Sequence, residues 1–207
     1  KNDVTIVGTH LEDNLIKDII SNDHLHPGLK TKLPKEIKFV QLNELQPLLE
    51  KDLDLVVAGI SSIGIEWFAK QISKNYKKKL PIVLLTKGLS IVENELTTLS
   101  DKIKNILEKN GHSEINISAI KGPCLAAGLA NKMRTGTVIA NQNIKECLSL
   151  KNIISTNYYS TEISEDITGV ELSGAIKNIY SMLIGASEGL SNSKATKEIQ
   201  SKYFLNT

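Results

Sequence analysis

The sequence is poor in residues that mark several functional classes. It has two cysteines, Cys124 and Cys147, and their separation fits neither a disulfide framework nor a metal site. We therefore expect a reducing, cytoplasmic location. Twenty-five basic residues against 23 acidic ones leave a net charge of +2, without a basic face or tail, so we expect no nucleic-acid partner.

Long hydrophobic runs are also lacking. The most apolar stretch, residues 172–187, is broken by Ser173, Gly174, Lys177, Asn178 and Gly185, so we expect no membrane insertion. The four histidines form no metal constellation, and we expect no bound metal. Signal peptide, Walker loop and nucleophile elbow patterns are absent. The 207 residues suffice for one substantial domain, or for one domain plus part of a second.

Short hydrophobic runs alternate with segments of helical periodicity, a pattern typical of a parallel sheet with crossover helices. We expect strands at residues 4–7, 37–40, 53–58, 81–86, 115–120, 136–140 and 158–161. We expect helices at residues 11–20, 42–49, 64–76, 95–109, 125–133 and 144–150, and a loop at 26–34. From residue 166 onward only helix is expected. The chain is thus α/β, with a dinucleotide-binding domain at 1–164 and the first helices of an all-α domain at 165–207.

Three loops rich in small residues follow expected strands: AGISS at 58–62, TKG at 86–88 and KGPCLA at 121–126. In an open parallel sheet, ligands bind in the crevice outside the carboxyl ends of the strands. Lys87 would hold its ammonium over that crevice, and the helix after Gly122-Pro123 would turn free amides toward an anion. Taken alone, TKG also fits an ordinary strand-ending turn with an exposed lysine.

The last expected helix carries a single charge between residues 172 and 187, on Lys177. Small or polar residues share its side of the helix: Val170, Gly174, Asn178, Ser181 and Gly185. We expect the opposite side, with Leu172, Ile179 and Leu183, to pack into a core, and Lys177 to face a groove that a ligand can enter. An amine held there is a candidate proton donor. The alternative is a surface lysine whose stem covers apolar neighbours.

Several segments together resemble the NAD(P)-dependent glycerol-3-phosphate dehydrogenases in order and spacing: DLVVAGISS, LPIVLLTKGLSI, KGPCLA, DITGVELSGAIKNIYS and GLSNSKA. The most specific is GVELSGAIKN, which is similar to the family signature G-V-E-L-x-G-A-x-K-N. The resemblance covers nearly the whole chain. It implies reversible reduction of dihydroxyacetone phosphate, a small phosphorylated substrate, by NADH or NADPH. It also implies a Rossmann-like domain, a homodimer and a place in glycerophospholipid metabolism.

The same resemblance implies roles for individual residues. Lys177 would be the catalytic lysine, protonating the carbonyl oxygen as hydride reaches the carbon, and Lys87 would assist by orienting substrate and cofactor. Asn178 would hydrogen-bond the substrate. Ser61 and Ala126 would lie against the cofactor. These roles agree with the chemistry, because hydride transfer builds alkoxide charge that a preorganised ammonium stabilises.

The sequence departs from the family at both ends. It has no G-x-G-x-x-G motif, and residues 4–9 align with the family's second strand. It stops before the family's later G-D-L and R-N segments. We therefore expect the middle of a dehydrogenase, either as a fragment or as a short relative without activity.

Smaller departures lie in the loops and weaken the substrate assignment. Cys124-Leu125 replaces the usual Ser/Thr-Phe, Gly128 replaces a glutamate, and Gly59-Ile60 replaces Val-Pro before Ser61. A ketopantoate-type or related hydroxyacid dehydrogenase and an inactive binding remnant of the fold stay open as alternatives. The choice between NAD and NADP is also open.

Overall fold

A computed structural model describes residues 2–76 and 80–190 of the chain. Its strands are β1 (Thr5–Val7), β2 (Leu25–His26), β3 (Thr31–Lys32), β4 (Lys38–Val40), β5 (Val56–Ala58), β6 (Ile82–Leu84), β7 (Leu89–Val92), β8 (Glu95–Thr98), β9 (Ile117–Lys121), β10 (Thr135–Ala140) and β11 (Tyr159–Ser164). Its helices are α1 (Asp13–Ser21), α2 (Leu45–Leu49), α3 (Ile65–Ser73), α4 (Leu99–Lys109), α5 (Ala126–Ala130), α6 (Ile144–Ile154) and α7 (Ile167–Leu190), with short 3-10 turns η1 (Leu42–Glu44) and η2 (Ser62–Gly64).

A five-stranded sheet forms the centre, in the order β11-β10-β9-β6-β5. The strands β5, β6 and β9 are parallel neighbours, with Leu84 opposite Ala119. This confirms the α/β class and a mostly parallel sheet. One detail of the prediction is wrong: β10 runs antiparallel to β9, and β11 runs parallel to β10. The reason is that the short helix α5 does not carry the chain back across the sheet, whereas α6 provides a full crossover between β10 and β11.

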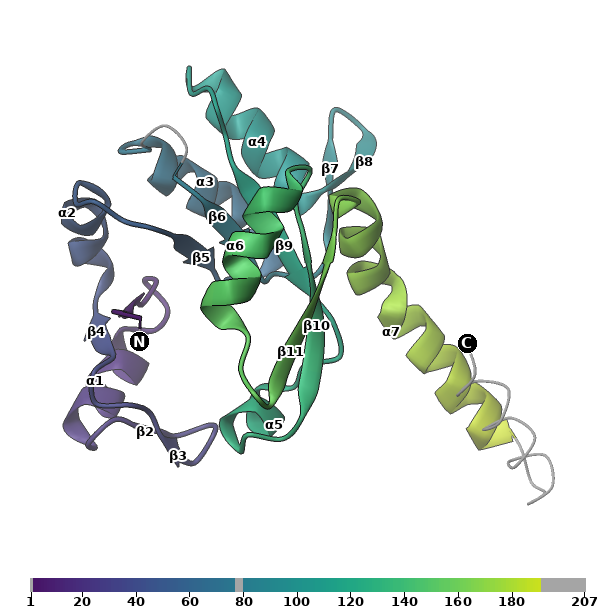
Figure 1. The fold of residues 1–207 in the computed structure, drawn as a ribbon, viewed down its shortest axis with the longest axis horizontal. Helices are drawn as coiled ribbons and strands as arrows, with labels where there is room; N and C mark the ends of the chain where they lie inside the picture. The colour runs from purple at the N-terminus through teal and green to yellow at the C-terminus, as the bar shows by residue number, and fades with distance from the viewer. Residues whose placement is uncertain (1, 77–79, 191–207) are drawn as a thin grey trace.

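Helices cover both faces of this sheet (Figure 1). Successive strand residues point to opposite faces. In β6, Ile82 and Leu84 belong to the core under α3 and α4, whereas Val83 belongs to the core under α6. In β9, Ala119 faces α7 and Ile120 faces α6. Residues two apart from Ala119 therefore lie on the α4 and α7 side.

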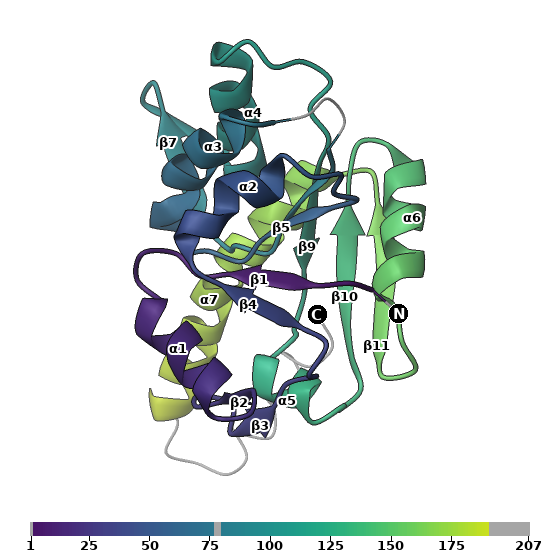
Figure 2. The ribbon, with the colours of Figure 1, turned by 90° about the vertical axis from the view of Figure 1, so that its left-hand side faces the viewer.

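The strands β1 and β4 form a separate parallel pair beside the main sheet (Figure 2). Within the described residues, β1 hydrogen-bonds only to β4, and β5 only to β6. A doubly wound sheet has the order 3-2-1-4-5-6. The observed β4-β1 and β5-β6-β9 groups match 3-2 and 4-5-6, which agrees with the expected alignment of residues 4–9 to a second strand.

Two antiparallel hairpins were not expected from the sequence. One, β2-β3, runs from Leu25 to Lys32 and overlaps the expected loop at 26–34. The other, β7-β8, takes up the first turn of the expected helix at 95–109. Glu93 and Asn94 adopt positive φ values of 53° and 65° at its tip, as a tight two-residue turn requires. The helix α4 begins after Thr98, whose Oγ1 accepts a hydrogen bond from the Asp101 amide at 3.1 Å. Its end at Asn110-Gly111 is as expected, with Gly111 at φ 82°.

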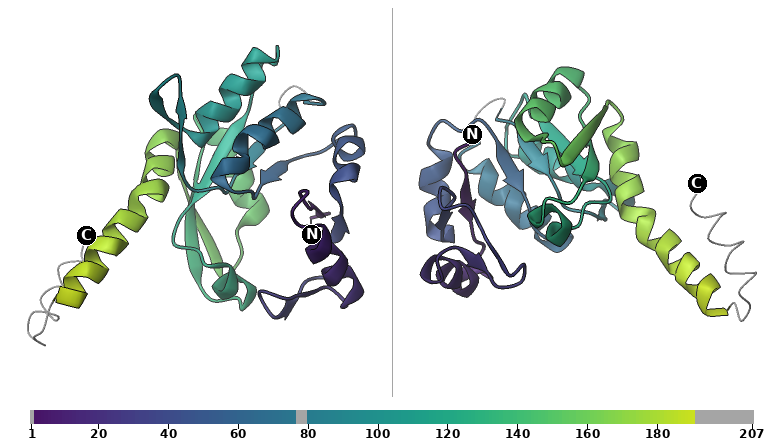
Figure 3. Two further views of the ribbon diagram at one scale, coloured as in Figure 1. Left: turned by 180° about the vertical axis from the view of Figure 1, so that it is seen from behind. Right: turned by 60° about the horizontal axis from the view of Figure 1, so that its bottom comes forward.

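The long helix α7 packs along β9 at its start and then leads away from the sheet (Figures 1 and 3). Asp166 Oδ1 accepts a hydrogen bond from the Gly169 amide at 2.7 Å, as expected for a capping residue. The side predicted to enter the core is wrong, because Leu172, Ile179 and Leu183 are exposed. The helix instead docks through Val170 and Gly174, since small residues let it approach the sheet closely. No described helix is long and apolar enough to span a membrane.

The proposed domain boundary near residue 164 coincides with the end of β11 and the start of α7. The division into 1–164 and 165–207 stays a prediction. Residues 191–207 lie outside the described part of the chain, including most of the GLSNSKA segment.

Candidate functional site

The carboxyl ends of β5, β6 and β9 meet at one edge of the sheet. Because these strands are parallel neighbours, the loops that follow them lie side by side, and they carry Ser61, Lys87 and Ala126. All three residues are exposed. The structure thus places Ser61 and Lys87 in adjacent loops and Ala126 at the start of α5, which follows the third loop, and the cofactor roles of all three remain predictions.

Hydrogen bonds and glycines hold these three loops close to each other. The Lys87 ammonium donates to the Gly122 carbonyl at 3.5 Å, and the Thr86 hydroxyl donates to the Ile60 carbonyl at 2.7 Å. Gly88 adopts φ 136°, and a Cβ there would lie 3.2 Å from the Ser62 Cβ. The loop after β6 is therefore tied to both neighbouring loops, which fixes where the Lys87 side chain starts.

The loop after β9 depends on Gly122. This residue adopts φ 154°, and a Cβ on it would lie 2.8 Å from Thr137 Cα and 2.9 Å from the Gly136 carbonyl oxygen. A side chain would collide with the backbone of β10. The helix that follows spans only Ala126–Ala130, so the expected helix at 125–133 is shorter than predicted.

Lys177 and Asn178 lie on α7 past the point where it packs on β9, and both are exposed. Among the described residues, the Lys177 ammonium has no ion pair, and its carbonyl accepts a hydrogen bond from the Ser181 hydroxyl at 3.2 Å. The amine is thus free to contact a ligand. Its exposure also fits the alternative of a surface lysine, so the catalytic role of Lys177 stays a prediction.

Two buried charged residues beside this edge were not singled out from the sequence. Lys121, the last residue of β9, is 4% exposed, and its ammonium donates to the Leu84 carbonyl at 3.2 Å. Glu171 on α7 is fully buried, and its carboxylate accepts hydrogen bonds from the Ser100 hydroxyl and amide. Both residues stand inside the segments KGPCLA and GVELSGAIKN. The signal in the sequence was the spacing of Lys121, two residues after Ala119, because residues two apart in a strand lie on the same face of the sheet.

Burial dominates the ionisation of this pair. It lowers the pKa of Lys121 to about 8, against the attraction of Glu171 and together with repulsion from Lys87. Burial likewise raises the pKa of Glu171, against its hydrogen bonds from Ser100 and the charge of Lys121. Each group is therefore easier to neutralise than its exposed counterpart.

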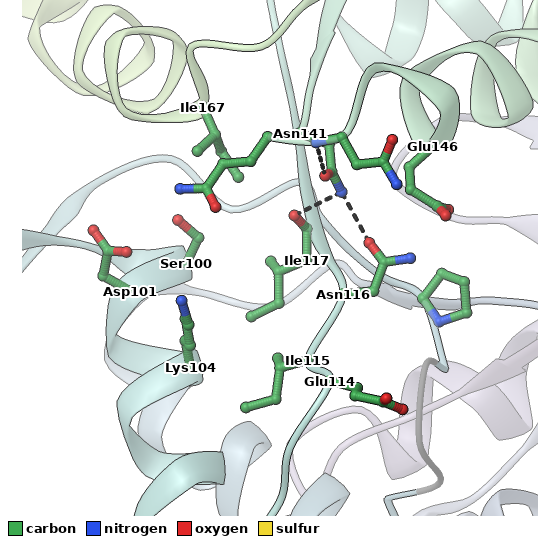
Figure 4. Close-up of a pocket in the computed structure, with 13 residues that line it drawn as sticks. Ser100, Asp101, Lys104, Glu114, Ile115, Asn116, Ile117, Asn141, Glu146 and Ile167 are labelled. Carbon is green, nitrogen blue, oxygen red and sulfur yellow. Dashed lines mark hydrogen bonds between the residues drawn. The ribbon is translucent and has the colours of Figure 1, made fainter.

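A pocket of about 480 Å³ lies at the opposite edge of the sheet, by the amino ends of β6 and β9 (Figure 4). Asn141 is one of its lining residues, and the side-chain amide of Asn141 donates to Asn116 Oδ1 and Ser118 Oγ at 2.9 and 2.8 Å. Its oxygen accepts from the Asn143 amide at 2.8 Å. These polar groups satisfy one another and hold the ends of β9 and β10 together, so the pocket reads as structural.

At the carboxyl edge, the loop after β5 leaves room for part of a dinucleotide. Gly59 meets nothing within 4 Å, so a ligand can approach the backbone after β5. The loop after β1 is different, because a Cβ on Gly8 would lie 2.8 Å from Ile16 Cγ1. Gly8 serves the packing of α1. Within residues 2–76 and 80–190, no cluster of three or more His, Cys, Asp or Glu side chains is placed to hold a metal.

Comparison with known proteins gives consistent matches. The profile of the NAD-dependent glycerol-3-phosphate dehydrogenase N-terminus matches residues 1–147. The NADP(+)-dependent glycerol-3-phosphate dehydrogenase of Archaeoglobus fulgidus is 30% identical over 206 residues, which is 100% of this chain and 59% of the relative. The glycerol-3-phosphate dehydrogenase [NAD(P)+] of Mesoplasma florum is 34% identical over 137 residues, 66% of this chain and 40% of that protein.

Solved structures support the same fold. Glycerol-3-phosphate dehydrogenase from Coxiella burnetii aligns with a TM-score of 0.76 at 20% identity, over 95% of this chain and 57% of that one. The enzyme from Dunaliella salina gives the same TM-score at 20% identity, over 98% of this chain and 36% of that one. This chain thus spans 59% or less of each of these relatives. On the profile match and the alignment of this whole chain to part of the Archaeoglobus enzyme, the chain belongs to the NAD-dependent glycerol-3-phosphate dehydrogenase family.

Proposed function

We propose that the protein interconverts dihydroxyacetone phosphate and glycerol 3-phosphate with NADH or NADPH. One observation carries this proposal: Ser61, Lys87 and Ala126 share one edge of the sheet, and α7 passes that edge with Lys177 and Asn178 exposed. The relative from Archaeoglobus fulgidus, named NADP(+)-dependent glycerol-3-phosphate dehydrogenase, aligns over 206 residues of the chain. The carboxyl edge of an open α/β sheet is where such folds bind ligands.

In this proposal each residue has a defined task. NAD(P)H, when bound, supplies the hydride. The Lys177 ammonium donates a proton to the carbonyl oxygen as negative charge builds there. Lys87, fixed by its bond to the Gly122 carbonyl, orients the anionic substrate, and Asn178 hydrogen-bonds a substrate oxygen. Ser61 and Ala126 would contact the cofactor.

The direct test measures substrate reduction by the whole protein. We expect oxidation of NADH or NADPH with dihydroxyacetone phosphate and none with ketopantoate. Turnover of ketopantoate alone would replace this function by the ketopantoate-type one. Calorimetry with NADH on residues 1–207 addresses the third possibility, since the sequence has no G-x-G-x-x-G motif. The absence of both turnover by the whole protein and NADH binding would identify a remnant of the fold.

We further propose a cytoplasmic homodimer that acts in glycerophospholipid metabolism. The two free cysteines, one of them buried, support a reducing location. Apolar residues on α7 are exposed, among them Ile179, Met182 and Leu183, and this supports their burial against a second subunit. Sedimentation equilibrium of the whole protein tests the dimer, and a monomer mass across micromolar concentrations would contradict it.

A further inference from the structure

The side chain of Lys121 lies directly under Gly174 of α7. A Cβ on Gly174 would lie 3.1 Å from the Lys121 Cδ, 3.2 Å from its Cγ and 3.4 Å from its Cβ. The lysine stem therefore fills the space that any other residue at 174 would use. This contact is close packing between a strand end and a helix, and it involves none of the residues assigned a role above.

Both ends of the Lys121 stem are fixed. Its Cα belongs to β9, where Lys121 pairs with Val138 of β10. Its ammonium is held on the Leu84 carbonyl of β6 at 3.2 Å. A lysine side chain normally has large rotamer freedom, but this one spans two neighbouring strands and is 4% exposed. The surface it offers to α7 is consequently rigid.

One turn before Gly174, Glu171 fixes the same side of the helix. Its carboxylate accepts hydrogen bonds from the Ser100 hydroxyl and amide at the start of α4. One turn after Gly174 comes Lys177, about 4.5 Å further along the helix axis. Because a helix is stiff over three residues, the depth at which Gly174 rests on Lys121 sets where Lys177 stands relative to the carboxyl edge.

We propose that Lys121 is a positioning residue. Its buried stem is the seat of Gly174, meaning the surface on which this glycine packs, and this contact places Lys177 over the crevice. This inference rests on the proposed function for the meaning of Lys177, and it adds a residue outside the expected site. The stem performs the task, so a side chain of similar length without charge also performs it. A shorter side chain leaves α7 free to shift.

Glycine substitutions on α7 test the seat with a matched control. Gly174→Ala forces the helix or the lysine stem to move by a few tenths of an ångström, whereas Gly185→Ala meets open space within 4 Å. Both changes raise helix propensity equally. We expect Gly174→Ala to lower kcat about 10-fold or more, since small misplacements of reacting groups are costly. KM should change little, and Gly185→Ala should leave both constants unchanged.

Substitutions of Lys121 separate stem from charge. We expect Lys121→Met to keep kcat within about threefold of the wild type and Lys121→Ala to lower it about as far as Gly174→Ala. The double variant Lys121→Ala/Gly174→Ala should recover much of the loss, because the new methyl group occupies vacated space. Equal loss in Lys121→Met and Lys121→Ala would overturn the seat, since the charge would then be responsible.

A double-mutant cycle tests whether Lys121 acts through Lys177. In a Lys177→Met background, Gly174→Ala should lower the remaining kcat by less than about twofold, because the group it positions is gone. An undiminished 10-fold loss would overturn the inference.

Hydrogen exchange separates failure of the seat from failure of the proposed function. In the absence of any substrate, amides of residues 175–180 should exchange faster in Gly174→Ala than in Gly185→Ala. A wild type without turnover would remove the proposed function and leave this comparison valid. Identical exchange in the two variants, with unchanged melting temperature, would overturn the seat itself.

Discussion

At the scale of single residues, the carboxyl edge combines open positions with crowded ones. A Cβ on Gly59 would meet nothing within 4 Å, whereas a Cβ on Gly122 would lie within 3 Å of the β10 backbone. Two lysines follow the same contrast: Lys177 is exposed on α7, and Lys121 is buried at the end of β9. Exposed positions of this kind are available to ligands, and crowded ones hold the loops in place.

The first prediction concerns Gly122. Gly122→Ala should lower the free energy of unfolding by about 2 kcal/mol or more, because φ 154° is strained for any other residue and the methyl group meets backbone. Gly59→Ala is the matched control and should change stability by less than about 0.5 kcal/mol. Urea unfolding followed by circular dichroism measures both. Equal stabilities would mean that the loop after β9 relaxes freely.

The second prediction concerns Lys177. Lys177→Met in the whole protein should lower turnover at least about 100-fold, because the proton donor is lost. The melting temperature should stay the same, since the side chain is exposed and has no ion pair within the described residues. Steady-state kinetics and thermal unfolding give the two readings. Near-normal turnover would return Lys177 to the class of surface lysines.

The third prediction concerns the charge of Lys121. Its pKa of about 8 in the folded protein lies below the ordinary 10.5, so between these pH values the unfolded chain binds more protons and wild-type stability rises with pH. Below pH 8 the buried ammonium destabilises the fold. Lys121→Met should therefore raise the free energy of unfolding at pH 7 by about 1 to 3 kcal/mol, an advantage that shrinks between pH 8 and 10.5.

Urea unfolding at pH 7 and pH 10 measures this difference. Lys145→Met, on the exposed side of α6, is the control and should show no such pH dependence. A destabilised Lys121→Met variant at pH 7 would mean that attraction to Glu171 outweighs the burial of the lysine.

At the scale of elements, caps and turns determine where helices begin. The prediction placed a helix start at residue 95, but β8 extends to Thr98 and α4 starts at Leu99. Thr98 Oγ1 accepts from the Asp101 amide and donates to the Asp101 carboxylate at 2.7 Å. A threonine followed three residues later by an acid is typical of a helix start.

The fourth prediction follows from this cap. Thr98→Ala should lower the free energy of unfolding by about 1 kcal/mol, since it leaves the first turn of α4 without its side-chain acceptor. Thr98→Ser should retain most of the stability. Thr97→Ala, one residue earlier in β8, provides the comparison for loss of a strand threonine. Chemical unfolding measures all three, and an equal cost at Thr97 and Thr98 would contradict a specific capping role.

Local patterns in the sequence predicted the elements well where a segment has one environment. The buried runs of β6 and β9 and the end of α4 at Lys109 follow the expected positions. The docking side of α7 could not be predicted, because close approach to β9 depends on the lysine stem beneath Gly174. The reversed direction of β10 likewise depends on pairing between distant segments.

At the scale of the whole molecule, the protein consists of a large sheet with two helical layers and a small strand pair beside it (Figures 1 and 2). The buried apolar residues gather around β6 and β9 and include Ile82, Leu84 and Ile103. The β1-β4 pair contributes no residue to the three core clusters of the described chain. Stability should therefore differ strongly between the two sheets.

The fifth prediction concerns this difference. In residues 1–207, amides of Thr5–Val7 and Lys38–Val40 should exchange with solvent hydrogen far faster than those of Ile82–Leu84 and Ile117–Lys121. A two-stranded pair has too little buried apolar surface to persist alone, so it opens locally at low free energy, whereas the central strands open only with global unfolding. Exchange measured by mass spectrometry on overlapping peptides resolves these segments. Equal protection of both pairs would show that β1 and β4 are held by contacts as strong as those of the central sheet.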